Sequence, residues 1–260
     1  MNKKKINKIV NKKRKKPITC LTAYSKSIAQ IAGKYCDLIL VGDSLGMVLY
    51  GMKSTRDVNI NTMMLHAKTV KSFCKKSIVV FDMPYKSYTN KNIAYKNAKK
   101  IVKLTKCDAV KLEGGKKIIP IIKKLIRNKI PVMGHVGILP QTDKKFSFKG
   151  KKDKERNKLL RDTKLLEDAG VFSIVLECVE TKLAKKISEQ IKIPTIGIGS
   201  SINCDGQVLV IDDLIGLSQS KLKFVKKFVD ITKLIEIGVK KYKSEVLKRS
   251  FPRAKHSFFK

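Results

Sequence analysis

The sequence predicts an α/β fold, a single (β/α)8 barrel, and three observations lead to it. Eight short apolar runs rich in β-branched residues recur along the chain, helical stretches alternate with them, and 260 residues suit one large domain. Near-continuous apolar strands that alternate with helices pair in parallel and are covered by those helices. Eight such units in about 250 residues close naturally into a barrel. An open doubly wound sheet is the alternative, although the Gly-x-Gly segment at Gly197 is too weak to indicate a dinucleotide site.

The predicted elements alternate regularly along the chain. The strands cover residues 17–23, 37–43, 77–84, 107–115, 129–137, 172–179, 193–200 and 207–213. The stretches between them carry apolar residues near helical spacing. These helices cover residues 25–35, 61–76, 90–104, 116–128, 154–170 and 180–191, and a closing helical region covers residues 221–248. We expect residues 1–260 to form one barrel domain with a basic N-terminal arm at residues 1–16.

The chain is strongly basic, with 58 Lys and Arg against 21 Asp and Glu, a net charge of +37. Such a balance is typical of nucleic-acid-binding proteins. The excess is almost all lysine, however, whereas base readout and bidentate phosphate recognition favour arginine. No reader motif or basic stripe with interleaved aromatic residues is visible. We therefore interpret the charge as a solvated lysine surface and expect no specific nucleic-acid partner.

Neither a membrane segment nor a secretory signal is indicated. No apolar run approaches the roughly 20 residues needed to span a bilayer, so we expect no membrane association. The basic N-terminus lacks the apolar region of a secretory signal. The six cysteines are scattered without a Cys-x-x-Cys pair, as in proteins of a reducing compartment. We expect a cytoplasmic protein.

Polar side chains stand at the carboxyl ends of the predicted strands, where active sites of such barrels form. They are Asp43 and Ser44 after the second strand, Asp82 on the third, Lys111 and Glu113 on the fourth, His135 on the fifth and Glu177 on the sixth. Each alone has a structural explanation, as a cap, a core histidine or an ion pair. Together, converging from five strands, they indicate a functional site. The carboxylates Asp43, Asp82 and Glu113, with a histidine and no cysteine pair, favour a hard cation, Mg²⁺.

Several sequence blocks carry a resemblance to a known family. LVGDSLGM, FDMPY, VKLEGG, PVMGHVGILPQ, VLECV, IPTIGIGS, CDGQVLV and the terminal HSF resemble ketopantoate hydroxymethyltransferases, in the same order from Ile18 to Phe258. The resemblance implies a cytoplasmic (β/α)8 barrel, commonly a homodecamer, that binds Mg²⁺. It implies transfer of a one-carbon hydroxymethyl unit from 5,10-methylenetetrahydrofolate to the 2-oxo acid 3-methyl-2-oxobutanoate. The product would be 2-dehydropantoate (ketopantoate) for pantothenate and coenzyme A biosynthesis, formed through an enolate that Mg²⁺ stabilises.

The resemblance also implies roles for individual residues. Asp43 and Asp82 fall where the family binds the metal and its substrate, with Glu113 near the metal. Ser44 and Lys111 fall where the keto acid is held, and Glu177 falls on the proton acceptor. His135 is expected to line the substrate site. It is also the rival general base, because imidazole is the commonest one.

The sequence departs from the family pattern at three places. Ser25 stands where the family usually has Asp, and Asp212 where it commonly has His. Residues 142–152 form a short lysine-heavy segment in place of a glycine-rich one and are a candidate lid. The alternative function is another Mg²⁺-dependent C–C lyase of the phosphoenolpyruvate/isocitrate lyase type. Those enzymes typically carry a Lys-Lys-Cys-Gly-His lid, which this sequence lacks.

Overall fold

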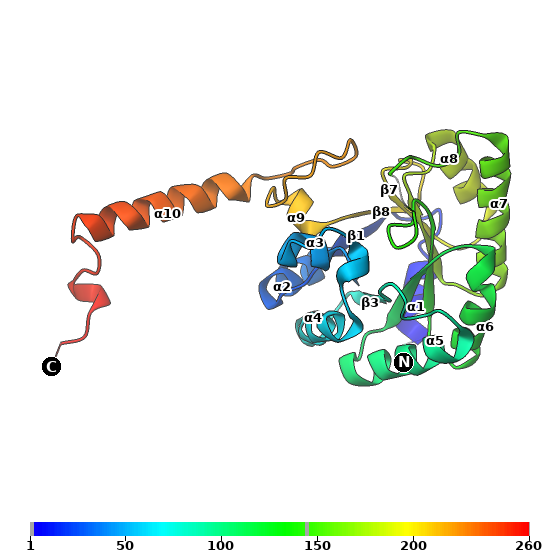
Figure 1. The fold of residues 1–260 in the computed structure, drawn as a ribbon, viewed down its shortest axis with the longest axis horizontal. Coiled ribbons are helices and arrows are strands. Elements are labelled where there is room, and N and C mark those ends of the chain that lie inside the picture. The colour runs from blue at the N-terminus through cyan, green and yellow to red at the C-terminus, as the bar shows by residue number, and fades with distance from the viewer. Residues whose placement is uncertain (1–2, 144–145, 260) are drawn as a thin grey trace. The chain divides into compact units, whose positions relative to one another are not determined.

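The strands close into a barrel, as the sequence predicts. The computed structural model describes residues 3–143 and 146–259. Each strand pairs in parallel with the next, and β8 pairs in parallel with β1, which closes the ring and excludes an open sheet (Figure 1). The strands are β1 Ile18–Thr22, β2 Leu38–Val41, β3 Ile78–Asp82, β4 Ala109–Glu113, β5 Val132–Gly137, β6 Ser173–Glu177, β7 Thr195–Ile198 and β8 Gly206–Leu209.

The last predicted strand is wrong at its carboxyl end. Strand β8 stops at Leu209, and residues Ile211–Leu214 form the short helix α9. Asp212 and Asp213 occupy the first turn of that helix, where acidic side chains are favoured by the helix dipole. The apolar run through residue 211 therefore continues from a strand into a helix.

Helices alternate with the strands and surround them (Figure 1). Those predicted from spacing are α2 Lys26–Tyr35, α4 Ile60–Phe73, α5 Lys91–Thr105, α6 Ile119–Arg127, α7 Asp153–Asp168 and α8 Thr181–Gln190. Two short helices between β2 and α4 were not predicted, α3 Leu45–Tyr50 and η1 Thr55–Asp57, whereas the turn η2 Lys116–Ile118 begins the predicted helical stretch 116–128. Ser25 is the N-cap of α2 and accepts a hydrogen bond from the backbone N–H of Ile28. Ser and Asp are both good N-caps, so this departure from the family preserves the local chemistry.

The basic N-terminal arm contains a helix, α1 Lys3–Val10, packed on the barrel. Ile6 and Ile9 are 8% and 4% exposed and join the apolar cluster formed by strand beginnings such as Ile18. Lys13 Nζ, just after the helix, lies 2.7 Å from Oδ2 of Asp205. The helix therefore closes the amino-terminal mouth of the barrel. Residues 1 and 2 of the arm lie outside the described residues.

Alternate residues of the strands point into the barrel and build its core. One set of inward side chains is apolar and includes Leu40, Val80, Ala109, Met133 and Val175. They form a packed layer across the middle of the barrel. Any inward side chain further along the strands must therefore lie at the carboxyl-terminal mouth.

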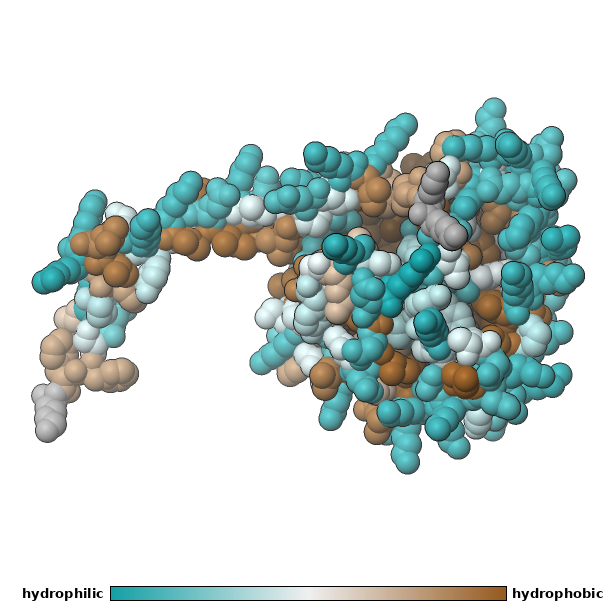
Figure 2. Space-filling view, in the orientation of Figure 1, coloured by the Kyte–Doolittle hydropathy of each residue, from teal (hydrophilic) through white to brown (hydrophobic). Residues whose placement is uncertain are grey.

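The chain divides into two compact units, residues up to Val210 and residues from Ile211. The second unit holds α9, the helix α10 Ile231–Leu247 and the turn η3 Ala254–His256, whereas residues 221–230 of the predicted closing region carry no helix. No residue of α10 is buried, and apolar side chains line it (Figure 2). The exposed ones include Leu234, Ile235, Ile237, Val239, Tyr242 and Leu247. The single-domain assignment of residues 1–260 stays a prediction.

The surface of the visible barrel face is dominated by hydrophilic side chains (Figure 2). This distribution agrees with a solvated lysine surface. Among the described residues, no helix combines the length and the apolar character that crossing a bilayer requires.

Candidate active site

The predicted site residues stand on the inward face of neighbouring strands, one step beyond the apolar layer. Asp82 follows Val80 by two residues, as His135 follows Met133 and Glu177 follows Val175, so each shares a face with a core residue. Strand register places Asp82 beside Lys111, and Glu113 beside His135. The same register places Gly137 beside Glu177. The pleat and the parallel register together gather these side chains at the carboxyl-terminal mouth.

Lys111 and Asp82 form a buried ion pair at the centre of the site. Lys111 Nζ lies 2.6 Å from Oδ2 of Asp82, and the two residues are 4% and 1% exposed. Burial alone would lower the pKa of Lys111, but the carboxylates of Asp82, Glu113 and Asp43 outweigh it and raise the pKa. Lys111 therefore stays charged, a fixed positive charge inside a water-poor mouth.

Asp43 lies just past the end of β2 and completes the group of carboxylates. It is 5% exposed, and burial, followed by repulsion from Asp82, raises its pKa to about 7. Ser44, the next residue, shares a 2.8 Å hydrogen bond with the Tyr24 hydroxyl. The apolar strand β2 is thus followed by a buried carboxylate beside Asp82 and by a hydroxyl that is paired with Tyr24.

Glu113, His135 and Glu177 form a row along the other side of the mouth. His135 Nδ1 lies 3.6 Å from Oε1 of Glu113, and its Nε2 lies 3.3 Å from Oε2 of Glu177. Neither ring nitrogen makes a hydrogen bond with good geometry among the described residues. Burial, followed by the charge of Lys111, lowers the pKa of His135, so the ring is neutral. Burial also raises the pKa of Glu113 well above its usual value.

Glu177 is the most accessible carboxylate of the row. Its side chain is 15% exposed, against 1% for the side chains of Glu113 and His135. A substrate entering the mouth can therefore reach Glu177 more readily than either neighbour.

Two further residues at the mouth were missed by the sequence analysis, Gln141 and Tyr88. Gln141 is 1% exposed and donates through Nε2 to Oδ2 of Asp43, 2.8 Å away. The Tyr88 hydroxyl donates to Oε1 of Gln141 over 2.5 Å. Gln141 is the last residue of the PVMGHVGILPQ block, and its place in that block could have identified it as a candidate site residue. Tyr88 carries no comparable signal, because its role depends on a contact 53 residues away in sequence.

The backbone around Glu177 is tightly constrained. Gly137 has a φ of +105°, and a Cβ there would lie 2.1 Å from the backbone oxygen of Glu177. Cys178, directly after Glu177, adopts a left-handed φ of +48°. Lys149 of the candidate lid donates its backbone N–H to the oxygen of Cys178, 2.8 Å away. Within the lid segment 142–152, residues 144 and 145 lie outside the described residues.

The carboxylates fit a magnesium ion that is held only partly by protein. Oδ1 of Asp82 is buried without a hydrogen-bond partner among the described residues, an atom that a cation would satisfy. In residues 3–143 and 146–259, no three His, Cys, Asp or Glu side chains form a preassembled metal cluster. Mg²⁺ does not need one, because it usually takes one or two carboxylates and keeps several waters or substrate oxygens.

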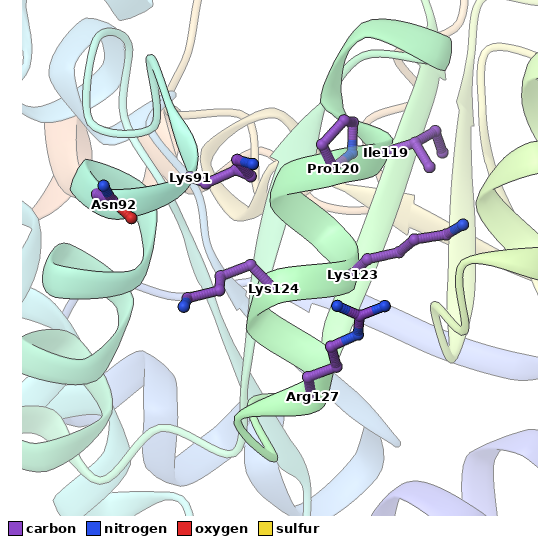
Figure 3. A pocket seen from close by; sticks show the side chains of 7 residues that line it. All are labelled: Lys91, Asn92, Ile119, Pro120, Lys123, Lys124 and Arg127. Carbon is purple, nitrogen blue, oxygen red and sulfur yellow. The ribbon is translucent and has the colours of Figure 1, made fainter.

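A separate basic cavity of about 440 Å³ lies between α5 and α6, away from the carboxylates (Figure 3). It is lined by Lys91, Asn92, Ile119, Pro120, Lys123, Lys124 and Arg127. Exposed lysines of this kind cover the chain's helices generally, so the cavity contributes nothing to the site.

Fold and site together define a (β/α)8 barrel with buried charged side chains gathered at its carboxyl-terminal mouth, the arrangement typical of barrel enzymes. The sequence matches the model of the ketopantoate hydroxymethyltransferase family over residues 3–254. It is 58% identical over 258 residues to the 3-methyl-2-oxobutanoate hydroxymethyltransferase of Pelagibacter ubique, covering 99% of this chain and 100% of the relative. Identity to the Anaplasma marginale protein of the same name is 44%, over 95% of this chain and 90% of the relative. The chain belongs to the ketopantoate hydroxymethyltransferase family.

Solved structures with the same fold come from a wider group. A phosphonopyruvate hydrolase in complex with oxalate and Mg²⁺ superposes with a TM-score of 0.62 at 10% identity, covering 96% of this chain and 92% of the other. A phosphoenolpyruvate phosphomutase from Streptomyces platensis superposes with a TM-score of 0.64 at 10% identity, covering 94% of this chain and 87% of the other. At such low identity these similarities show the barrel fold alone.

Proposed function

We propose that this chain transfers a hydroxymethyl unit to 3-methyl-2-oxobutanoate, the reaction for which its relatives are named. The observation that carries the proposal is the buried mouth in which Lys111 faces Asp43, Asp82 and Glu113, with Glu177 at the accessible edge. A 2-oxo acid needs a positive charge for its oxygens and a carboxylate base for its C3 proton. Both are present, on strands rigid enough to position them.

Lys111 and Ser44 are proposed to hold the keto acid. Lys111 places its ammonium where negative charge develops on the 2-oxo oxygen, and a preorganised charge in a dry site is most effective there. Asp82 fixes that ammonium through the 2.6 Å ion pair. Ser44 can donate its hydroxyl hydrogen to the substrate carboxylate, with the Tyr24 hydroxyl 2.8 Å away to orient it.

Asp43 and Asp82 are proposed to hold Mg²⁺, with Glu113 beside it. Bound there, Mg²⁺ supplies Lewis-acid polarisation of the substrate carbonyl, which is worth several kcal/mol. The raised pKa of Asp43 supports the assignment, because it reports buried like charges with too little compensation. Glu113 Oε2 already accepts the backbone N–H of Gln141 over 3.1 Å, which leaves it less free than Asp82.

Glu177 is proposed as the general base, with His135 as a neutral neighbour. Glu177 takes the C3 proton of 3-methyl-2-oxobutanoate. Water adds to the methylene bridge of 5,10-methylenetetrahydrofolate, both of its C–N bonds break, and tetrahydrofolate and a formaldehyde unit result. The carbanion electrons at C3 form a bond to the formaldehyde carbon, the C=O π electrons pass to its oxygen, and that oxygen takes a proton to become the new hydroxyl group. The 1% exposure of His135 argues against direct proton abstraction by its ring, since the base must reach the substrate.

The direct test is an assay of the purified protein with 3-methyl-2-oxobutanoate, 5,10-methylenetetrahydrofolate and Mg²⁺, following ketopantoate by mass. We expect product formation that EDTA abolishes and added Mg²⁺ restores. Undiminished activity in a metal-free preparation would overturn the metal assignment. Cleavage of a 2-oxo or hydroxy acid without folate, and no ketopantoate, would support the lyase alternative instead.

A homodecamer in the cytoplasm is proposed for the assembled enzyme. The exposed apolar side chains of α10 support self-association, because patches of this kind commonly mark interfaces. All six cysteines lie among the described residues and are free thiols, which agrees with a reducing compartment. The charge of +37 per subunit opposes assembly, so we expect the oligomer to be more stable at higher ionic strength. Light scattering across a salt series tests this, and a monomer at every salt concentration would contradict it.

A further inference from the structure

The side chain of Gln141 uses every hydrogen-bonding group it has, and it does so at the mouth of the barrel. Its Nε2 donates to Oδ2 of Asp43 over 2.8 Å and to the backbone oxygen of Met83 over 3.0 Å. Its Oε1 accepts from the Tyr88 hydroxyl over 2.5 Å. Its backbone N–H donates to Oε2 of Glu113 over 3.1 Å. One buried residue thus contacts two of the three proposed metal carboxylates.

The orientation of this amide is unambiguous. If it were flipped, Oε1 would face two other acceptors, the Asp43 carboxylate and the Met83 carbonyl. Tyr88 keeps the proton that it donates, because burial raises the pKa of its hydroxyl. That hydroxyl also accepts the backbone N–H of Glu113 over 3.3 Å, so Tyr88 and Gln141 form one connected network.

The loop after β5 does not need the side chain of Gln141 to stay anchored. Arg56 Nε donates to the backbone oxygen of Gln141 over 2.9 Å, and Arg56 Nη2 donates to the backbone oxygen of Asp143 over 3.1 Å. These bonds secure the loop for any residue at position 141. Only the side chain reaches Asp43.

We propose that Gln141 is a positioning residue that holds the Asp43 carboxylate in place for the divalent cation, with Tyr88 fixing the orientation of its amide. The inference rests on the proposed function, because it concerns the same cation site. Partners one step behind a metal ligand typically change metal affinity by about 10- to 100-fold when they are removed. The amide donates a hydrogen to Oδ2 of Asp43 and would thereby restrain the carboxylate that is proposed to hold the cation.

The test compares cation binding in five full-length proteins stripped of metal: the parent, Gln141→Met, Tyr88→Phe, the double variant of these two, and the control Ser188→Ala. Methionine preserves the length and volume of Gln141 and leaves both backbone hydrogen bonds intact. Ser188 is 4% exposed on α8 and bonds to Thr195 across 2.7 Å, so its variant also loses a buried hydrogen bond, but away from the site. Mn²⁺ binding is followed by electron paramagnetic resonance, Mg²⁺ binding by calorimetry, and folding by thermal unfolding.

We expect Gln141→Met to weaken Mn²⁺ binding by about 10- to 100-fold. Tyr88→Phe should weaken it less, and the double variant should be no worse than Gln141→Met alone, because Tyr88 acts through Gln141. Ser188→Ala should bind as the parent does. The activity lost by Gln141→Met should shrink as Mg²⁺ is raised, which a purely structural defect would not allow.

The outcomes separate this inference from the function on which it rests. A parent protein that binds neither ion in the millimolar range contradicts the proposed metal site itself. A parent that binds, together with a folded Gln141→Met that binds equally well, overturns the role of Gln141 alone. If Gln141→Met does not fold, the Mn²⁺ affinity of Tyr88→Phe tests the proposal instead. An affinity equal to that of the parent would overturn it.

Discussion

The two mouths of the barrel are lined by the same strands but are closed in opposite ways. At the amino-terminal mouth, Ile6 and Ile9 of α1 cover an apolar cluster. At the carboxyl-terminal mouth, Asp82, Lys111 and Glu113 are equally buried. Apolar burial stabilises the fold by about 1.5–3 kcal/mol for each such side chain. Burial raises the pKa of Glu113, so ionisation of this carboxyl opposes folding.

This difference teaches where to look for function in a barrel. A mouth built for stability places apolar side chains inside and leaves its ion pairs at the edge, as Lys13 does with Asp205. The other mouth retains charges whose burial is unfavourable, which is the pattern typical of a functional site.

Gly137→Ala should have the largest effect, a loss of several kcal/mol in the free energy of unfolding. The new Cβ would lie 2.1 Å from the backbone oxygen of Glu177, at a φ of +105° that side chains rarely adopt. Chemical denaturation measures the loss. Gly238→Ala on α10 is the matched control, since nothing lies within 4 Å of its Cβ. That control should gain up to about 1 kcal/mol.

Ile9→Ala should cost about 2–5 kcal/mol of stability and leave the turnover number of the folded enzyme unchanged. Ile9 is 4% exposed and lies at the mouth opposite the site. The exposed Ile31→Ala on α2, at 59% exposure, should cost far less. A large drop in kcat for folded Ile9→Ala would contradict the idea that the amino-terminal mouth contributes to stability alone.

In the metal-free protein, ionisation of Asp43 should lower the free energy of unfolding as pH rises from about 4 to 7. The folded pKa of Asp43 is raised from 3.8 to about 7, so across this window the folded state holds a proton that the unfolded state has released. Each pKa unit of such a shift is worth about 1.4 kcal/mol. Asp43→Asn should therefore become progressively more stable relative to the parent across this range. Denaturation at several pH values in EDTA measures it, and a constant difference would contradict the buried charge.

Cys178→Gly should be more stable than Cys178→Ala by about 1 kcal/mol, the smallest of these effects. Both variants lose the thiol, but only glycine relieves the left-handed φ of +48° at this position. Thermal unfolding of the pair isolates the backbone contribution. Equal stability would show that the conformation next to Glu177 carries no strain.

The barrel and the convergence of the candidate site residues at one mouth could be predicted from the sequence, because both depend on periodicity. Asp82, His135 and Glu177 each lie two residues after a core residue of the same strand, and therefore on the same face. This spacing is visible in the sequence alone. The helix in the N-terminal arm was not predicted, because isoleucines at positions 6 and 9 stand among lysines and gain their environment only from the closed barrel. Gln141 was missed for the same reason, since its partners are contributed by three other strand ends.

The central claim is that Glu177 at the charged mouth removes the C3 proton of 3-methyl-2-oxobutanoate. The most direct measurement is exchange of that proton into D₂O with Mg²⁺ and without folate, compared between the parent, Glu177→Gln and His135→Asn. We expect Glu177→Gln to fold and to bind the keto acid but to exchange the proton about 10²- to 10⁴-fold more slowly, the usual contribution of a positioned base. Exchange at the parent rate in Glu177→Gln, with loss in His135→Asn, would contradict this expectation and assign the base to His135.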